Sequence, residues 1–108
     1  MTFCDLANRN SKELAQGVHA QTFWGDRMLL SYVELGANSE VANHSHPHEQ
    51  CGVVLEGELV LSINGEPRTL VAGDCYVIPG GIEHWAKTSK SAARVVDIFS
   101  PIREEYKY

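Results

Sequence analysis

His44-Ser45-His46-Pro47-His48-Glu49-Gln50 is the stretch of this chain that decides both its fold and its chemistry. Histidine is the commonest metal-binding side chain, and residues two apart on an extended strand point to the same face. His44 and His46 therefore predict a local pair of ligands, which the distant His84 can complete where strands meet. Gln50 adds a neutral oxygen donor within a run that favours a strand. The pattern indicates a metal site in a small all-β domain.

Composition limits the possible classes of protein. The chain has 108 residues, of which 44% are hydrophobic and 21% charged, which is typical of one soluble globular domain spanning residues 1–108. A net charge of −5 argues against nucleic acid as a partner. The apolar runs are too short to span a membrane, and the N-terminus lacks the layout of a secretory signal. We expect no membrane partner.

Cysteine usage indicates the cellular compartment. Cys4, Cys51 and Cys75 form an odd set without a CxxC pair, which argues against a disulfide framework. Such a set fits a reducing compartment, and we expect a cytoplasmic protein. Because neither Cys51 nor Cys75 has a local base, we interpret both as small buried hydrophobic residues.

Turn signals divide the chain into short β-rich runs. Residues 1–26 are polar and mixed, with one piece able to form a helix near residues 11–15. Asn64-Gly65 predicts a hairpin, because both residues tolerate the positive φ of a type I′ turn. The expected strands cover residues 28–35, 40–46, 50–55, 58–63, 67–71, 75–78, 84–88 and 93–99. This series without a long helix predicts an all-β sandwich or barrel, most simply a jelly roll.

Two spaced patterns carry a family resemblance. The first runs from Gly36 through His44-x-His46-x3-Gln50 to Gly57, and the second is Gly73-x5-Pro79-x-Gly81-x2-His84. Together they resemble the two motifs of the cupin superfamily over residues 36–88. The resemblance implies a single-domain cupin, a double-stranded β-helix (jelly-roll) barrel that holds a divalent metal ion near one mouth.

The same resemblance implies the ligand set. His44, His46 and His84 occupy the ligand positions, Gln50 stands where cupins usually have Glu, and Thr88 replaces the usual closing Asn of the second motif. Neutral donors would leave the ion its full +2 charge and make it a stronger electrophile. Alternatively, Gln50 could point away, or the site could be a relic without chemistry. Zn, Ni, Fe and Mn all suit these donors, and no organic cofactor is expected.

The C-terminal strand adds a second chemical cluster. Asp97 and Phe99 share one face of that strand, and Arg103 follows shortly after Pro101. A buried carboxylate is costly and is tolerated for proton transfer, whereas arginine is a natural bidentate partner for a substrate carboxylate. The alternatives are that Asp97 pairs with Arg103 at the strand end, or that the tail charges are solvated.

With this tail, the chain is similar to the small cupins of pectin and alginate breakdown (the KdgF type). Those proteins convert 4,5-unsaturated monouronates to linear ketone forms. The resemblance implies Asp97 and Arg103 as the essential acid and cation and a small anionic sugar acid as substrate, and Phe99 could pack against the sugar ring. Two other functions stay open: a metal-dependent cupin dioxygenase, and a non-catalytic cupin that binds a sugar or small acid.

Two strands are apolar on both faces. Residues 51–55 and 76–78 show no polar alternation, so the face outside the barrel needs a cover. A second subunit is the expected cover, which predicts a homodimer. The alternative is that the N-terminal segment folds over this face.

Overall fold

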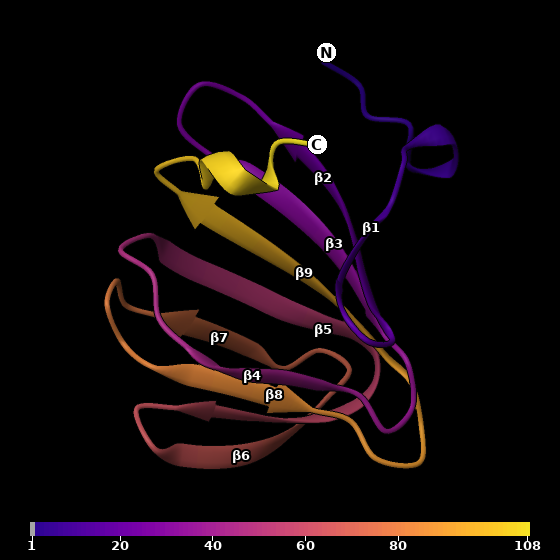
Figure 1. Cartoon of the computed structure of the whole chain (residues 1–108), viewed down its shortest axis with the longest axis vertical. Helices are drawn as coiled ribbons and strands as arrows, with labels where there is room; N and C mark the ends of the chain where they lie inside the picture. Colours follow the sequence, from indigo (N-terminus) through magenta and orange to yellow (C-terminus); the bar gives the residue numbers. More distant parts are fainter. Residues whose placement is uncertain (1) are drawn as a thin grey trace.

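Nine strands and two short 3-10 helices make up the part of the chain that the computed structural model describes, residues 2–108 (Figure 1). The helices are η1 (Leu6–Asn8) and η2 (Glu104–Tyr106). The strands are β1 (Lys12–Ala15), β2 (Val18–Trp24), β3 (Leu29–Leu35), β4 (Glu40–His44), β5 (Glu49–Ile63), β6 (Glu66–Val71), β7 (Cys75–Ile78), β8 (His84–Lys87) and β9 (Ala93–Ser100). Every strand pairing is antiparallel.

The long strand β5 joins two layers of the barrel. Its first half pairs with β7 and β9, and its second half pairs with β6 and β8. An irregularity in the register between Val54 and Glu56 lies between the halves, as is common where a strand turns a corner. One layer continues from β9 to β3, β2 and β1, and the other ends at β4. The result is a near-closed antiparallel jelly-roll barrel, as expected (Figure 1).

The barrel interior changes from apolar to polar along its axis. Val33 and Val95 are register partners in the aliphatic cluster that fills one end. Two residues further along the same strands, Ser31 and Asp97 are register partners. Because side chains two apart share a face, these two also point inward, and both are buried. Polar side chains therefore gather at one level of the barrel, next to the histidines.

Several boundaries differ from those that the sequence predicted. The expected strands 50–55 and 58–63 are one strand, β5, and the strand expected over 40–46 ends at His44. The hairpin at Asn64-Gly65 is confirmed: both residues have positive φ, 53° and 80°, and Ile63 pairs with Glu66.

The expectation that the N-terminal segment could form a helix near residues 11–15 was wrong. Residues 12–15 form β1 rather than helix, and β2 follows at residues 18–24. The buried residues of β2 include Val18, Ala20 and Thr22, which alternate with more exposed residues. This alternation is the signal of a half-buried strand, and pairing with β3 along its whole length fixes it.

The outer face of the larger layer keeps exposed apolar side chains. Val77, Cys51 and Ile98 are neighbours across β7, β5 and β9 and are all exposed. The N-terminal segment packs on the β2 end of this layer, where the Arg9 guanidinium lies 5.1 Å from the Phe23 ring. The interpretation of Cys51 and Cys75 as buried residues was wrong, because both are exposed. In the described residues, no helix is long and apolar enough to cross a membrane.

Candidate metal centre and adjoining cavity

Three histidines from two neighbouring strands and the loop after one of them converge inside the barrel. His44 and His84 are register partners on β4 and β8, and His46 follows in the loop after β4. One ring nitrogen from each lies within 4.8 Å of the others, a grouping that could hold a metal ion. The three histidines that the sequence singled out thus come together, while His48 lies outside the group, its ring centroid 5.5 Å from that of His46.

Backbone carbonyls set the orientation of all three rings. The Nδ1 atoms of His44, His46 and His84 lie 2.7, 3.1 and 2.9 Å from the carbonyl oxygens of Ala42, His48 and Ile82, respectively. A carbonyl only accepts hydrogen bonds, so in His44 and His84 the Nδ1 carries the proton and the Nε2 keeps its lone pair. His46 has a second oxygen, Oε1 of Gln50, 3.1 Å from its Nε2, so either of its ring nitrogens can carry the proton. Nε2 of His84 is buried without a partner in the described residues. A divalent ion fits this donor set.

Burial also keeps two of these rings neutral. It lowers the pKa of His46 to about 4, with smaller contributions from the charges of Arg103 and the other histidines. Burial is also the main cause that lowers the pKa of His84. Neutral imidazole is the form that binds metal.

Gln50 points toward the histidines and not away from them. Its side chain is buried, and Oε1 lies 3.1 Å from Nε2 of His46. Gln50 also makes a side-chain hydrogen bond to Asp97. A carboxylate accepts only from the amide NH2, which turns Oε1 toward the histidines. A glutamate here would place two carboxylates side by side, so the amide is the group that suits both neighbours.

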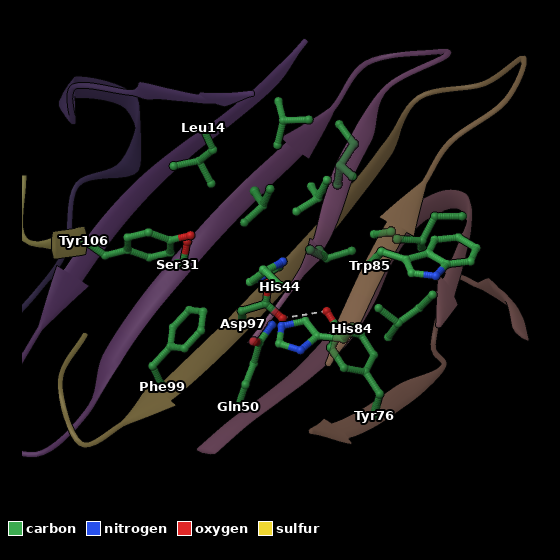
Figure 2. Close-up of a pocket in the computed structure, with 18 of the residues that line it drawn as sticks. Leu14, Ser31, His44, Gln50, Tyr76, His84, Trp85, Asp97, Phe99 and Tyr106 are labelled. Atoms are coloured by element: carbon green, nitrogen blue, oxygen red, sulfur yellow. Dashed lines mark hydrogen bonds between the residues drawn. The ribbon is translucent and has the colours of Figure 1, made fainter. Parts of the chain in front are cut away.

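A tyrosine also holds Asp97. The Tyr76 hydroxyl donates a hydrogen bond of 2.6 Å to Oδ1 of Asp97, drawn as a dashed line in Figure 2. Gly52 lies between them in the register, paired with both residues. A Cβ at Gly52 would collide with the Tyr76 ring and with Oδ1 of Asp97. Glycine at this position is therefore what allows the pair to form.

Desolvation dominates the acidity of Asp97. Burial raises the pKa of this carboxyl to about 6, although the hydrogen bonds from Tyr76 and Gln50 and the charge of Arg103 lower it. Burial also raises the pKa of Tyr76, which therefore stays a protonated donor. A carboxyl with a pKa close to neutral can both accept and return a proton.

The C-terminal tail brings a cation to the same cavity. Arg103, Phe99 and Tyr106 line it together with Asp97, Gln50, His44 and His84. Figure 2 shows Phe99 and Tyr106 among these residues. The Arg103 guanidinium lies 4.0 Å from the centre of the Tyr106 ring, and its Nε donates to Glu105 at 2.7 Å. Neither terminal nitrogen of Arg103 makes a hydrogen bond to residues 2–108. The alternative pairing of Asp97 with Arg103 is not seen.

The sequence predicted no functional role for three of the residues that line the cavity. Tyr76 was assigned only to an apolar strand, while Ser31 and Tyr106 received no role. The alternation Leu29, Ser31, Val33 places a serine in an otherwise apolar inward series, a signal that was available. The pairing of Tyr76 with Asp97 depends on β5 lying between β7 and β9, which no local pattern predicts.

Comparison with known proteins identifies the family. Residues 31–99 match the family described as the cupin domain, which is more than half of the chain, so the chain belongs to the cupin family. A structure of an RmlC-like cupin from Shewanella frigidimarina NCIMB 400 superposes with a TM-score of 0.92, 24% identity, and coverage of 98% of this chain and 96% of that one. This likeness confirms the fold.

Within the family, the chain is similar to a pectin degradation protein over most of its length. It is 27% identical to KdgF of Dickeya dadantii (strain 3937) over 97 residues, 88% of each chain. A structure of KdgF from Halomonas sp. gives a TM-score of 0.89 at 24% identity, covering 97% of both chains.

A shorter match has higher identity. The HTH-type transcriptional regulator PuuR of Escherichia coli (strain K12) is 46% identical over 57 residues, 52% of this chain. The match covers 31% of PuuR, so the chain spans about a third of the regulator's length.

Proposed function

We propose that this cupin converts 4,5-unsaturated monouronates to their linear ketone forms by ring opening and tautomerisation. The observation that carries the proposal is a buried acid, Asp97, hydrogen-bonded to Gln50 in a cavity that two of the three clustered histidines, His44 and His84, also line. Similarity to KdgF over most of both chains supports the substrate class. We assign the cavity to a small anionic sugar acid.

His44, His46, His84 and Gln50 are the residues that would hold the ion. Bound there by neutral donors, a divalent metal supplies Lewis acidity toward the carboxylate and the developing enolate oxygen of the substrate. The identity of the ion is left open, since imidazole and amide donors accept Zn, Ni, Fe and Mn.

Asp97 is assigned the proton transfers. The substrate is a cyclic enol ether with a hemiacetal hydroxyl, and opening it removes the proton of that hydroxyl. The ring C–O bond then breaks to give an aldehyde and an enolate, and protonation of carbon 4 gives the ketone. One proton leaves and one is added, so a single carboxyl can perform both transfers, with general acid–base catalysis worth about 10²–10⁴-fold.

Arg103 and Phe99 are assigned to binding. The terminal nitrogens of Arg103 are the donors that match a substrate carboxylate, while its Nε is held by Glu105. Phe99 is 2% exposed and lies between the His46 ring and the Tyr106 ring, with centroid distances of 5.6 and 5.5 Å. Its buried ring shapes the apolar side of the cavity.

Ultraviolet absorbance of the conjugated unsaturated acid provides the test. The metal-loaded protein should accelerate the loss of this absorbance above the spontaneous rate, in the absence of oxygen. Asp97→Asn supplies the matched inactive control. A rate equal to the spontaneous one would reject the proposed activity, and a requirement for oxygen with oxygen uptake would favour the dioxygenase alternative.

Similarity to the regulator PuuR supports a second candidate function, ligand binding without turnover. The same cavity would then bind a small acid through Arg103 and the metal centre. Calorimetry distinguishes the two, because a non-catalytic cupin would bind the unsaturated uronate and release it unchanged.

A further inference from the structure

Ser31 carries a buried hydroxyl without a partner. Its side chain is 0% exposed, and its Oγ makes no hydrogen bond to residues 2–108. Ser31 lines the same cavity as Asp97 (Figure 2). Arg103 lines this cavity too. Leaving a buried hydroxyl unsatisfied is unfavourable, and such groups are rare in native proteins. An orphaned hydroxyl at a cavity wall therefore indicates that a ligand completes it.

The strand register places Ser31 directly beside the proposed acid. Ser31 on β3 pairs with Asp97 on β9, and Asp97 pairs with Gly52 on β5. Strand β9 therefore has Ser31 on one side and the pair Gly52 and Tyr76 on the other. Ser31 flanks Asp97 on the side away from Gln50 and Tyr76.

Ser31 and Asp97 belong to a row of register partners that runs across the sheet, and the other hydroxyl groups in this row already make hydrogen bonds. Thr22, which pairs with Ser31 across β2 and β3, donates its Oγ1 hydrogen to the Tyr106 carbonyl oxygen at 2.5 Å. Tyr76 donates to Asp97 at the other end of the row. The Thr22 bond fixes the tail that carries Arg103 close to Ser31. Ser31 is thus an unused donor and acceptor between the acid and the anchored tail.

We propose that Ser31 binds a substrate oxygen beside the position where Asp97 exchanges its proton. The inference rests on the proposed function and adds a contact that selects a hydroxylated acid over an acid lacking that oxygen. A site built to hydrogen-bond a substrate oxygen discriminates against analogues without it, because its own polar group is then left unpaired.

The test compares Ser31→Ala with Ser62→Ala in the metal-loaded protein. Ser62 is also buried, 2% exposed, but does not line the cavity. Because Ser31 Oγ has no protein partner to lose, Ser31→Ala should keep or raise the melting temperature while lowering kcat/KM on the unsaturated uronate about 10-fold or more, mainly through KM. Ser62→Ala should keep the parent kcat/KM.

Each outcome bears on the inference. An unchanged kcat/KM in Ser31→Ala, with the parent active, would overturn the Ser31 assignment and leave the proposed function intact. A clearly lower melting temperature in the same variant would show that the hydroxyl is structural and also overturn it. A parent without activity on unsaturated uronates would reject the proposed function, and the Ser31 assignment with it.

Discussion

The phenol of Tyr76 donates a 2.6 Å hydrogen bond to Oδ1 of Asp97 across the space that Gly52 leaves open. Asp97 also has the amide of Gln50 beside it, and Oε1 of that amide lies 3.1 Å from Nε2 of His46. The acid, the amide and the imidazole therefore form one continuous chain of contacts. The predicted metal ligands and the predicted acid are coupled through Gln50.

Removing the carboxylate should separate metal binding from turnover. Asp97→Asn keeps a hydrogen-bond acceptor for Tyr76 but cannot shuttle a proton, so kcat should fall by about 10²–10⁴-fold. Metal content should stay at the parent level. In Tyr76→Phe, kcat should fall about 10-fold, because the substitution removes one hydrogen bond to a charged group. Parent-like turnover in Asp97→Asn would remove Asp97 from the mechanism.

Replacing Gln50 with glutamate should leave metal binding intact and impair proton transfer by Asp97. In Gln50→Glu the new side chain keeps an oxygen donor but repels ionised Asp97 and reduces the charge of the site. We expect parent-level metal content by elemental analysis and a clearly lower kcat. Undiminished turnover in this variant would show that the amide has no special role.

Stability of the metal-free protein should depend on the ionisation of Asp97. Burial raises its folded-state pKa from 3.8 to about 6. The stability associated with the protonated form is fully present below pH 3.8 and is lost as pH rises through about 6. The free energy of unfolding should fall by about 3 kcal/mol over this range, because the pKa shift is roughly two units.

The difference between parent and Asp97→Asn isolates this effect. In chelator-treated samples, Asp97→Asn should gain stability over the parent as pH rises from about 4 to 6, measured by urea unfolding. A constant difference over that range would mean that the carboxyl titrates normally.

The exposed face of the larger layer leads us to propose a homodimer. Val77, Cys51 and Ile98 lie side by side there and carry no charge, so two copies can meet without opposing like charges despite the net charge of −5. Light scattering after size exclusion should give twice the chain mass. Val77→Asp should give monomers, whereas Val71→Asp, at an exposed apolar residue on β6, should not. A monomeric parent contradicts the proposal.

The sequence predicted the parts of this molecule that have local signals. The spacing of His44, His46 and His84 predicted their convergence, and Asn64-Gly65 predicted its hairpin. The N-terminal strand β2 was missed because its buried Thr22 is polar and the next two residues, Phe23 and Trp24, are both apolar, which obscures the alternation. The continuity of β5 was missed because Glu56-Gly57 has the composition of a turn, whereas both residues continue the strand and pair with β9.

The contacts around Asp97 could not be predicted in the same way. Tyr76, Gly52 and Ser31 come from three strands, and only the order of strands in the sheet makes them neighbours. Each residue alone is compatible with ordinary packing. Their role follows from the register and from the unpaired hydroxyl of Ser31, and both are properties of the tertiary structure.

Elemental analysis of the purified, untagged chain tests the central claim most directly. After incubation with a divalent metal ion and removal of the excess, the parent should carry about one ion per chain, and His46→Ala should carry little or none, because it loses one of three convergent imidazoles. His48→Ala, outside the cluster, should match the parent. A parent that stays empty with Zn, Ni, Fe and Mn alike, or a His46→Ala variant that retains its ion, would contradict the account.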